Sequence, residues 1–206
     1  MKKRNFTLVE LLTVIAVIAV LAGMIVPAVN GAIKKGEMTK AKAEATTLAN
    51  AIKQYESTYG VLPIPKNMKS DDEAILDDSD KGKAAYTWLI NLLQGKSFSD
   101  DTHGNSGNYN RRGIKFLDVV GNTEGVYQDP WDQNYFVVMD ADYDGKMTNS
   151  SAKVPVDATT LHYSVVVWSI GPDGESATSA DKKNKDNVYS INTTWDAPNK
   201  KVKISK

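Results

Sequence analysis

Two patterns of apolar residues follow each other along the first part of the chain. Residues 6–29 read FTLVELLTVIAVIAVLAGMIVPAV, and Glu10 is the only charged side chain among them. From about residue 40 onward, apolar side chains recur every three or four positions, which is the spacing of one helix face. This stripe consists of Ala41, Ala45, Leu48, Ile52, Tyr55 and Tyr59. The pattern predicts one helix over about residues 6–59, apolar all round at first and amphipathic later.

Glycine and proline mark the end of this helix and its weakest point. Gly60 suits the helix end because glycine adopts the left-handed backbone conformation at little cost, and Pro63 disfavours a return to helix. A proline inside a helix removes a backbone hydrogen bond, so we expect a bend or a melted turn between Gly23 and Pro27.

The rest of the chain combines a second helix with strand-like segments. Apolar positions predict a helix near residues 83–94, whereas residues 97–113 have no periodicity and are expected to form a surface loop. Residues 135–140 and 161–171 are rich in β-branched and aromatic residues, which predicts two antiparallel strands, and residues 187–191 are a further short extended segment. A long helix packed on a small antiparallel sheet is an α+β fold.

Charge balance and residue usage exclude several classes of function. Lysine and arginine together number 25, as do aspartate and glutamate, so the chain has no overall basic field and nucleic acid is not expected as a partner. Cysteine is absent, which excludes disulfides, zinc–thiolate sites and cysteine nucleophiles. With only His103 and His162, a closed zinc site would require both histidines to converge with carboxylates.

The first apolar segment is long enough to cross a bilayer, which takes about 20 residues. Lys2, Lys3 and Arg4 precede it, and positive charges beside a membrane span favour the cytoplasmic side. The remainder of the chain would then lie outside the cytoplasm. A carboxylate within a membrane span costs roughly 2.5–3.5 kcal/mol on insertion scales, so Glu10 is expected to have a function.

The segment FTLVELLTVIAVIAVLAGMIVPAV resembles the N-terminus of type IV pilins and type II secretion pseudopilins. The resemblance implies that a prepilin peptidase cuts between Asn5 and Phe6 and that the new Phe6 amine is methylated. Glu10 matches the glutamate at the family's fifth mature position, and Pro27 matches a proline in the family's helix. The chain departs from the family at Asn5, where glycine is usual.

The resemblance also gives Glu10 a role in assembly. It implies that Glu10 of one subunit meets the Phe6 amine of its neighbour, which neutralises two charges in an apolar fibre core. The alternative is a glutamate that lies near the lipid headgroups or stays protonated in lipid.

Two later motifs narrow the resemblance to one branch of the family. DPWDQNYFVV at residues 129–138 resembles the DPWGNPY segment of the major, G-type pseudopilin, with departures at Asp132 and Gln133. SIGPDG at residues 169–174 resembles the strand and turn that follow in that family. The similarity covers roughly residues 1–65 and 126–195, and residues 66–125 have no counterpart.

The resemblance implies an organisation in three parts. Residues 1–5 are the leader, residues 6–30 the transmembrane and assembly helix, and residues 31–206 a periplasmic domain of pilin-like fold that includes the second half of the long helix. The chain would be a single-pass inner-membrane protein that forms a fibre with other pilin-like subunits on an assembly platform. The implied function is type II protein secretion, with a type IV pilus for adhesion, motility or DNA uptake as the alternative.

A second alternative is a binding or hydrolytic domain that uses the helix as a membrane anchor. Asp129, Asp132, Asp140 and Asp173 offer the two carboxylates that glycoside hydrolysis requires. The chain has no Gly-x-Ser-x-Gly elbow, phosphate-binding loop or metalloprotease helix motif, so we do not expect an enzyme.

The resemblance further implies a calcium site. In G-type pseudopilins the loop after GPDG binds calcium, and the matching positions are Asp173, Asp181 and Asp186. Asn187 stands where the family has a second aspartate, which leaves an amide carbonyl in place of one carboxylate. Calcium accepts oxygen from either group, but fewer negative ligands usually mean weaker binding.

Spacing alone indicates a second calcium candidate. Asp140, Asp142 and Asp144 alternate and Gly145 follows, which is the first half of a D-x-D-x-D-G calcium loop. The twelfth position would be Ser151 instead of glutamate, and no flanking helices are predicted, so an EF-hand is not expected. An acidic turn without metal is the alternative.

Overall fold

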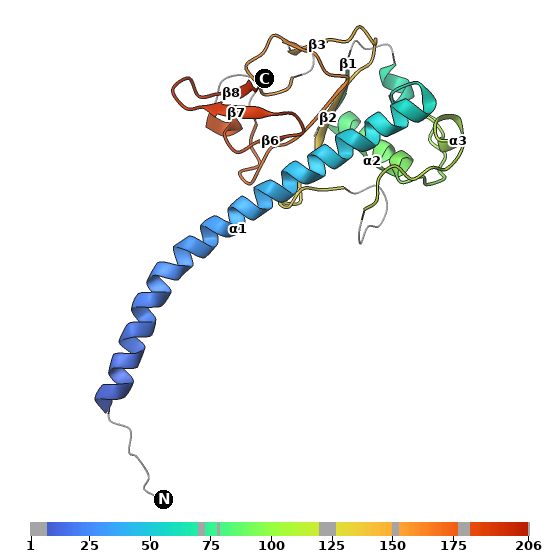
Figure 1. Cartoon of the computed structure of the whole chain (residues 1–206). Coiled ribbons are helices and arrows are strands. Elements are labelled where there is room, and N and C mark those ends of the chain that lie inside the picture. The colour runs from blue at the N-terminus through green and yellow to red at the C-terminus, as the bar shows by residue number, and fades with distance from the viewer. Residues whose placement is uncertain are drawn as a thin grey trace, which may run out of the picture. The chain divides into compact units, whose positions relative to one another are not determined.

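The computed structural model describes residues 8–69, 73–77, 79–119, 127–149, 153–176 and 182–205. The chain divides into two compact units, Met1–Thr39 and Lys40–Lys206. Helix α1 (Leu8–Tyr59) supplies the described part of the first unit and continues into the second (Figure 1). The predicted helix is therefore present.

The backbone of α1 stays helical through Gly23 and Pro27, so the melted turn that we expected there is not found. Proline removes a single N–H from the ladder of backbone hydrogen bonds, and the flanking turns keep theirs. The helix ends as predicted, at Gly60, which has the left-handed φ of 76°.

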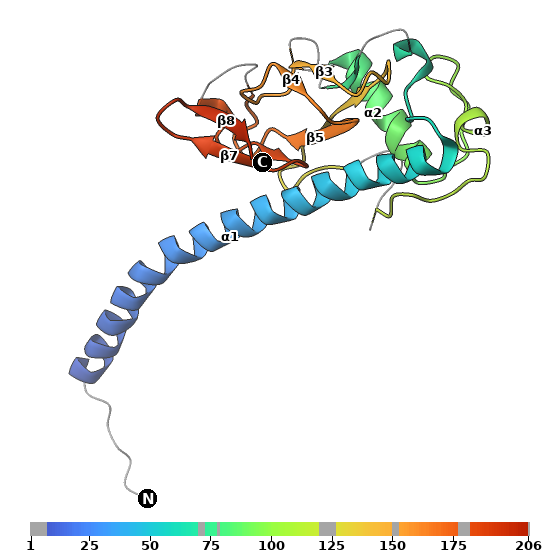
Figure 2. The same cartoon turned by 45° about the horizontal axis from the view of Figure 1, so that its top comes forward.

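The second unit is built on a four-stranded antiparallel sheet in the order β1-β2-β5-β6 (Figures 1 and 2). These strands are β1 (Glu73–Leu76), β2 (Phe136–Asp140), β5 (Val165–Ser169) and β6 (Val188–Tyr189). Val137 pairs with Val167 and Val138 with Val166, so the two strands predicted from composition are antiparallel neighbours. The unit as a whole is α+β, as the sequence indicated.

Each face of this sheet is buried in a separate hydrophobic core. Val137 and Val167 pack with the stripe of α1 and with helix α2 (Asp80–Leu93), whereas Val138 and Val166 pack on the other face with Trp168. Because both faces are covered, β2 and β5 are almost continuously apolar and show no alternation with polar residues.

The stripe of α1 contributes as predicted to the first of these cores. Ala45, Leu48 and Ile52 belong to it, and these three residues and Ala41 are completely inaccessible to solvent. Helix α2 begins three residues earlier than predicted, because Ser79 caps its N-terminus by accepting a hydrogen bond from the Gly82 N–H at 3.1 Å.

Short elements complete the second unit. Two hairpins pair β3 (Met147–Thr148) with β4 (Thr160–Leu161) and β7 (Thr193–Asp196) with β8 (Lys201–Ile204); Figure 2 shows β7 and β8 side by side. The remaining elements are α3 (Ser106–Tyr109) and the 3-10 turns Lys66–Met68 and Lys182–Asn184.

The prediction of a surface loop over residues 97–113 is wrong in part. The segment contains α3, and His103, Ser106 and Asn110 are buried. The Asn110 side-chain amide donates to the carbonyls of Leu92 and Ile114 at 3.0 and 2.8 Å, and His103 Nδ1 lies 2.8 Å from Asp100 Oδ2. These local hydrogen bonds allow a polar sequence to be buried, which periodicity alone does not reveal.

Candidate functional site

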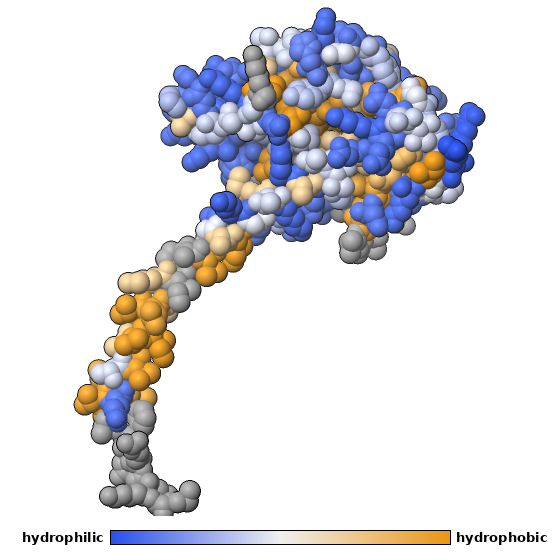
Figure 3. Space-filling view, viewed as in Figure 1, coloured by the Kyte–Doolittle hydropathy of each residue, from blue (hydrophilic) through white to orange (hydrophobic). Residues whose placement is uncertain are grey.

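The described part of the first unit is a helix whose apolar side chains face outward. Residues 8–24 are all exposed, including Leu8 at 77% and Met24 at 70%. Apolar residues cover this part of the helix in the space-filling view (Figure 3). Helix α1 is the one described helix that is long and apolar enough to cross a membrane, by length and composition. A helix that is apolar all round requires lipid or other helices to cover it.

Glu10 lies in the first described turn of α1. Pro27 lies in the helix further along, whereas Asn5 and Phe6 fall outside the described residues. Leader cleavage, methylation of Phe6 and the assembly role of Glu10 therefore stay predictions.

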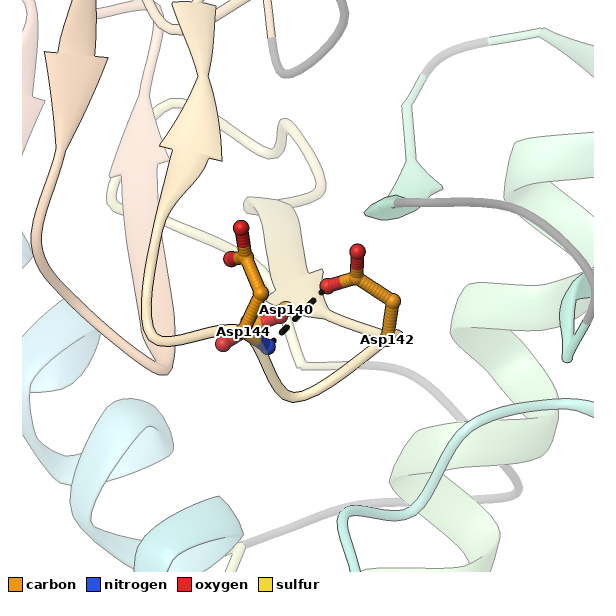
Figure 4. Close-up of side chains that lie close together, drawn as sticks. All are labelled: Asp140, Asp142 and Asp144. Carbon is orange, nitrogen blue, oxygen red and sulfur yellow. Dashed lines mark hydrogen bonds between the residues drawn. The ribbon is translucent and has the colours of Figure 1, made fainter.

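Three aspartates of the turn after β2 converge, as their spacing suggested. Carboxylate oxygens of Asp140, Asp142 and Asp144 all lie within 4.8 Å of one another, and Figure 4 shows the three side chains around one loop. Two oxygens bound to one calcium ion are at most about 5 Å apart, because each lies 2.3–2.6 Å from the ion. The separation is therefore compatible with a shared cation.

The same turn is also held by its own hydrogen bonds. Asp140 is buried, and its two oxygens accept the backbone N–H groups of Tyr143 and Gly145, each at 3.0 Å. Burial, followed by the neighbouring Asp142, raises the pKa of Asp140. Asp142 and Asp144 are exposed. The geometry fits both a cation site and an acidic turn without metal, so the calcium prediction stays open here.

The calcium position implied by the resemblance is described for two of its three aspartates. A Cβ atom at Gly171 would lie 2.5 Å from the Asp186 carbonyl oxygen, so the GPDG turn packs directly against Asp186. Burial, followed by the negative charge of Asp173, raises the pKa of the Asp186 carboxyl. Asp181 lies outside the described residues.

Asn187 contributes one further observation at this place. It is buried, and its Oδ1 makes no hydrogen bond within the described part of the chain. An acceptor oxygen of this kind suits a cation ligand, and it stands at the position where the resemblance expects a carboxylate. Asn187 thus places a buried oxygen with unused acceptor capacity directly after Asp186 in the chain.

The two motifs that resemble G-type pseudopilins are joined by a hydrogen-bond network that the sequence did not reveal. Asp129 Oδ1 accepts the N–H groups of Trp131 and Gln133 at 3.0 and 2.9 Å, and Oδ2 accepts the Ser169 hydroxyl at 2.5 Å. The Ser169 oxygen in turn accepts the Gly171 N–H at 3.0 Å. Both oxygens of the buried Asp129 are therefore occupied, which suits a positioning role better than a catalytic one.

Lys42 is a second important residue that sequence reasoning missed. Its Nζ donates to the carbonyls of Tyr189 and Ile191 at 2.5 and 2.6 Å, and so joins the helix to the end of β6. Lys42 lies outside the apolar stripe of the helix, where charged side chains are usually solvated. No signal in the local sequence indicates these partners, which lie almost 150 residues away.

Two comparisons with known proteins bear on the N-terminal region. Residues 1–26 match the prokaryotic N-terminal methylation motif. The chain is 40% identical over 55 residues to the type II secretion system core protein G of Escherichia coli (strain K12), a match that covers 27% of this chain and 38% of that protein. No solved structure matches the chain. The predicted resemblance to G-type pseudopilins is thus confirmed over the N-terminal region.

Proposed function

We propose that this chain is a structural subunit that inserts in the inner membrane and polymerises through its N-terminal helix into a pseudopilus for type II protein secretion. The observation that carries the proposal is the outward-facing apolar surface of residues 8–24, in a chain that bears a methylation motif. Lipid covers such a surface before assembly, and neighbouring helices cover it in a fibre. The globular part then lies in the periplasm.

Processing would create the charge that Glu10 requires. Cleavage after Asn5 by a prepilin peptidase would expose the Phe6 amine for methylation. Glu10 lies four positions after Phe6, which at the rise of an ideal α-helix corresponds to about 6 Å along the axis. In the fibre, Glu10 pairs with this amine of a neighbouring subunit. Breaking a buried ion pair by removing one partner costs about 3–5 kcal/mol, so a single substitution is expected to prevent assembly.

The test compares two glutamates of the same helix. Glu10→Ala is expected to insert in the membrane normally but to reduce fibres in electron micrographs at least tenfold. Glu37→Ala, which lies outside the apolar segment, is expected to assemble like the natural chain. Normal fibre yield from Glu10→Ala would refute the pairing, and an intact Met1 in mass spectra of membrane-extracted protein would refute the cleavage.

A type IV pilus subunit is the second candidate, because the methylation motif does not by itself separate pili from pseudopili. The similarity to core protein G favours secretion. Deletion of the gene separates the two: loss of secreted proteins with normal surface pili supports the pseudopilus, and the reverse supports the pilus. We expect no catalysis, since Asp129 is fully engaged in hydrogen bonds and Asp132 is exposed.

Calcium binding stays a prediction at two places. Calorimetric titration of the full chain in detergent micelles would measure it directly. Asp186→Asn is expected to weaken binding at the GPDG turn, and Asp142→Asn at the turn after β2, because each removes one negative ligand. Absence of both heat and a melting shift on adding calcium would contradict both sites.

A further inference from the structure

A pocket of about 560 Å³ lies within the second unit, where α1 ends. Its size falls in the range of small-molecule sites, which are mostly apolar and contain a few placed polar groups. Four tyrosines line it, Tyr55 and Tyr59 from the last turns of α1, and Tyr109 and Tyr143 from the segments opposite.

The walls offer apolar surface and few free hydrogen-bonding groups. The Tyr55 hydroxyl donates to the Tyr109 carbonyl at 2.9 Å, and the Tyr59 hydroxyl donates to Asn110 Oδ1 at 2.7 Å. The Tyr143 oxygen accepts the Leu62 N–H at 2.6 Å. Three of the four tyrosine oxygens are thus already engaged, and these side chains contribute mainly apolar ring surface to the lining. The pocket therefore suits an apolar or aromatic body.

Two cations stand at this pocket. Lys69 and Arg111 both line it, and neither forms an ion pair with a carboxylate among the described residues. Lys69 Nζ lies 4.9 Å from the centroid of the Tyr109 ring. The Tyr109 hydroxyl is buried and makes no hydrogen bond within the described part of the chain. Lys69 and Arg111 suit an anion, which accepts hydrogen bonds from both side chains and balances their charges.

The two cations determine where that anion is placed. Lys69 and Arg111 both line the pocket, so the favourable position for an anion is beside them.

The wall formed by Tyr143 is held in an unusual conformation. Its φ is 61°, in the left-handed region that non-glycine residues rarely adopt, and its N–H donates to Asp140 Oδ1 at 3.0 Å. Its hydroxyl is fixed by Leu62 at the other end of the side chain. Strained conformations held by the surrounding structure are typical of ligand clamps.

We propose that this pocket binds a carboxylate attached to an apolar or aromatic body, with the carboxylate beside Lys69 and Arg111 and the body against the tyrosine rings. Such a group is either the free carboxyl end of a peptide chain or a small aromatic acid. The pocket uses neither the N-terminal helix surface nor Glu10, so it can be tested whether or not the chain forms fibres.

The test uses the full chain in nonionic detergent micelles, with empty micelles as the blank. A fluorescent apolar peptide that ends in phenylalanine with a free carboxyl group is titrated and compared with the same peptide ending in an amide. The carboxylate form is expected to bind at least tenfold more tightly. Equal affinities, or no binding by either peptide, would overturn the proposal.

Competition with 3-phenylpropanoate identifies the source of the carboxylate. Displacement of the peptide at comparable concentration assigns the pocket to small aromatic acids, whereas displacement only by peptides assigns it to chain ends. Either result supports the shared chemistry of an apolar carboxylate.

Variants locate the binding within this pocket. Arg111→Gln combined with Lys69→Gln is expected to weaken the peptide at least tenfold, and Arg112→Gln less than twofold, because Arg112 is adjacent but does not line the pocket. Val61→Asp places a carboxylate on the wall and is expected to weaken binding more than Val61→Asn. Equal losses from the double variant and from Arg112→Gln, at unchanged melting temperature, would place the binding elsewhere and overturn the proposal.

Discussion

The two parts of helix α1 follow opposite rules, although both are rich in apolar residues. In the first part, leucine, isoleucine and valine are exposed on every side, with Leu12 at 55% and Ile18 at 58%. In the second part, Leu48 and Ile52 are completely buried and the charged residues lie elsewhere. The apolar surface of the first part requires lipid or other helices to cover it, whereas the apolar stripe of the second part is covered by the globular unit of the same chain.

This difference teaches that apolar content alone does not say what a helix stabilises. The arrangement of the apolar side chains around the helix axis decides this. A helix with one apolar stripe packs against one surface, whereas a helix that is apolar on all sides requires lipid or other helices around it. Substitutions in the first part should thus alter insertion and assembly, and those in the second part the folding of the globular unit.

The largest expected effect on stability comes from replacing a buried leucine by alanine. Leu48→Ala should lower the free energy of unfolding by about 2–5 kcal/mol, because it removes buried methyl groups and leaves a cavity. Leu12→Ala, the same change at an exposed position, should alter it by less than about 0.5 kcal/mol. Tryptophan fluorescence during denaturant unfolding measures both, since all four tryptophans lie beyond residue 80. A comparable loss from Leu12→Ala would remove the distinction between the two parts.

A charge introduced into the first part of the helix should impair membrane insertion without changing the stability of the globular unit. Ile18→Asp should make membrane insertion less favourable by about 2.5–3.5 kcal/mol and leave tryptophan-detected unfolding unchanged. Thr47→Asp places the same charge at an exposed position of the second part and should affect neither. Flotation of membranes on a density gradient measures insertion, and full recovery of Ile18→Asp with the membranes would speak against a spanning role.

The partly buried hydrogen bonds of Lys42 provide a further test on the second part of the helix. Lys42→Met should destabilise the globular unit by about 1–3 kcal/mol, because the carbonyls of Tyr189 and Ile191 lose their donor. Lys35→Met, at an exposed position of the first part, serves as the control and should change stability by less than about 0.5 kcal/mol. Equal stabilities of the two variants would show that the hydrogen bonds of Lys42 contribute nothing.

The smallest effect is the dependence of stability on pH. Burial lowers the pKa of Lys42 below its ordinary value of 10.5. Between that lowered pKa and 10.5 the unfolded chain binds more protons than the folded chain, so this lysine makes the free energy of unfolding rise with pH. Buried tyrosines with raised pKa values contribute a fall of stability at alkaline pH to both chains, so the test is the difference between them. In denaturant titrations, the slope of the free energy of unfolding against pH should be more positive for the natural chain than for Lys42→Met. Parallel pH profiles would mean that Lys42 titrates as if it were exposed.

Much of the fold could be predicted because its signals are local. The stripe through Ala41, Leu48 and Ile52 repeats at the helical period, and β2 and β5 stand out by their β-branched residues. Strand β1 was not predicted, because the residues on either side of it in the sequence are mostly acidic. Glu73 is nevertheless buried, since its carboxylate accepts the Thr148 N–H at 2.8 Å from a segment 75 residues away.

Of the candidate sites, too, only the one built from neighbouring residues could be predicted from the sequence. Spacing alone brought Asp140, Asp142 and Asp144 together, because three alternate positions of one turn are necessarily close. The tyrosine pocket was not predictable, since Tyr55, Tyr109 and Tyr143 come from three separate segments. Nothing in the order of residues indicates that those rings face one cavity.

The sequence by itself determined the long helix, its change from all-round apolar to amphipathic near residue 40, and the N-terminal motif with Glu10. These features depend on neighbouring residues and on the helical period. Only the tertiary structure decided that Lys42 donates hydrogen bonds to the carbonyls of Tyr189 and Ile191, that Asp129 joins the turn at residues 129–133 to Ser169, and that four tyrosines line one pocket. Those contacts connect residues far apart in the chain, so their hydrogen bonds and burial exist only once the sheet and helices have packed.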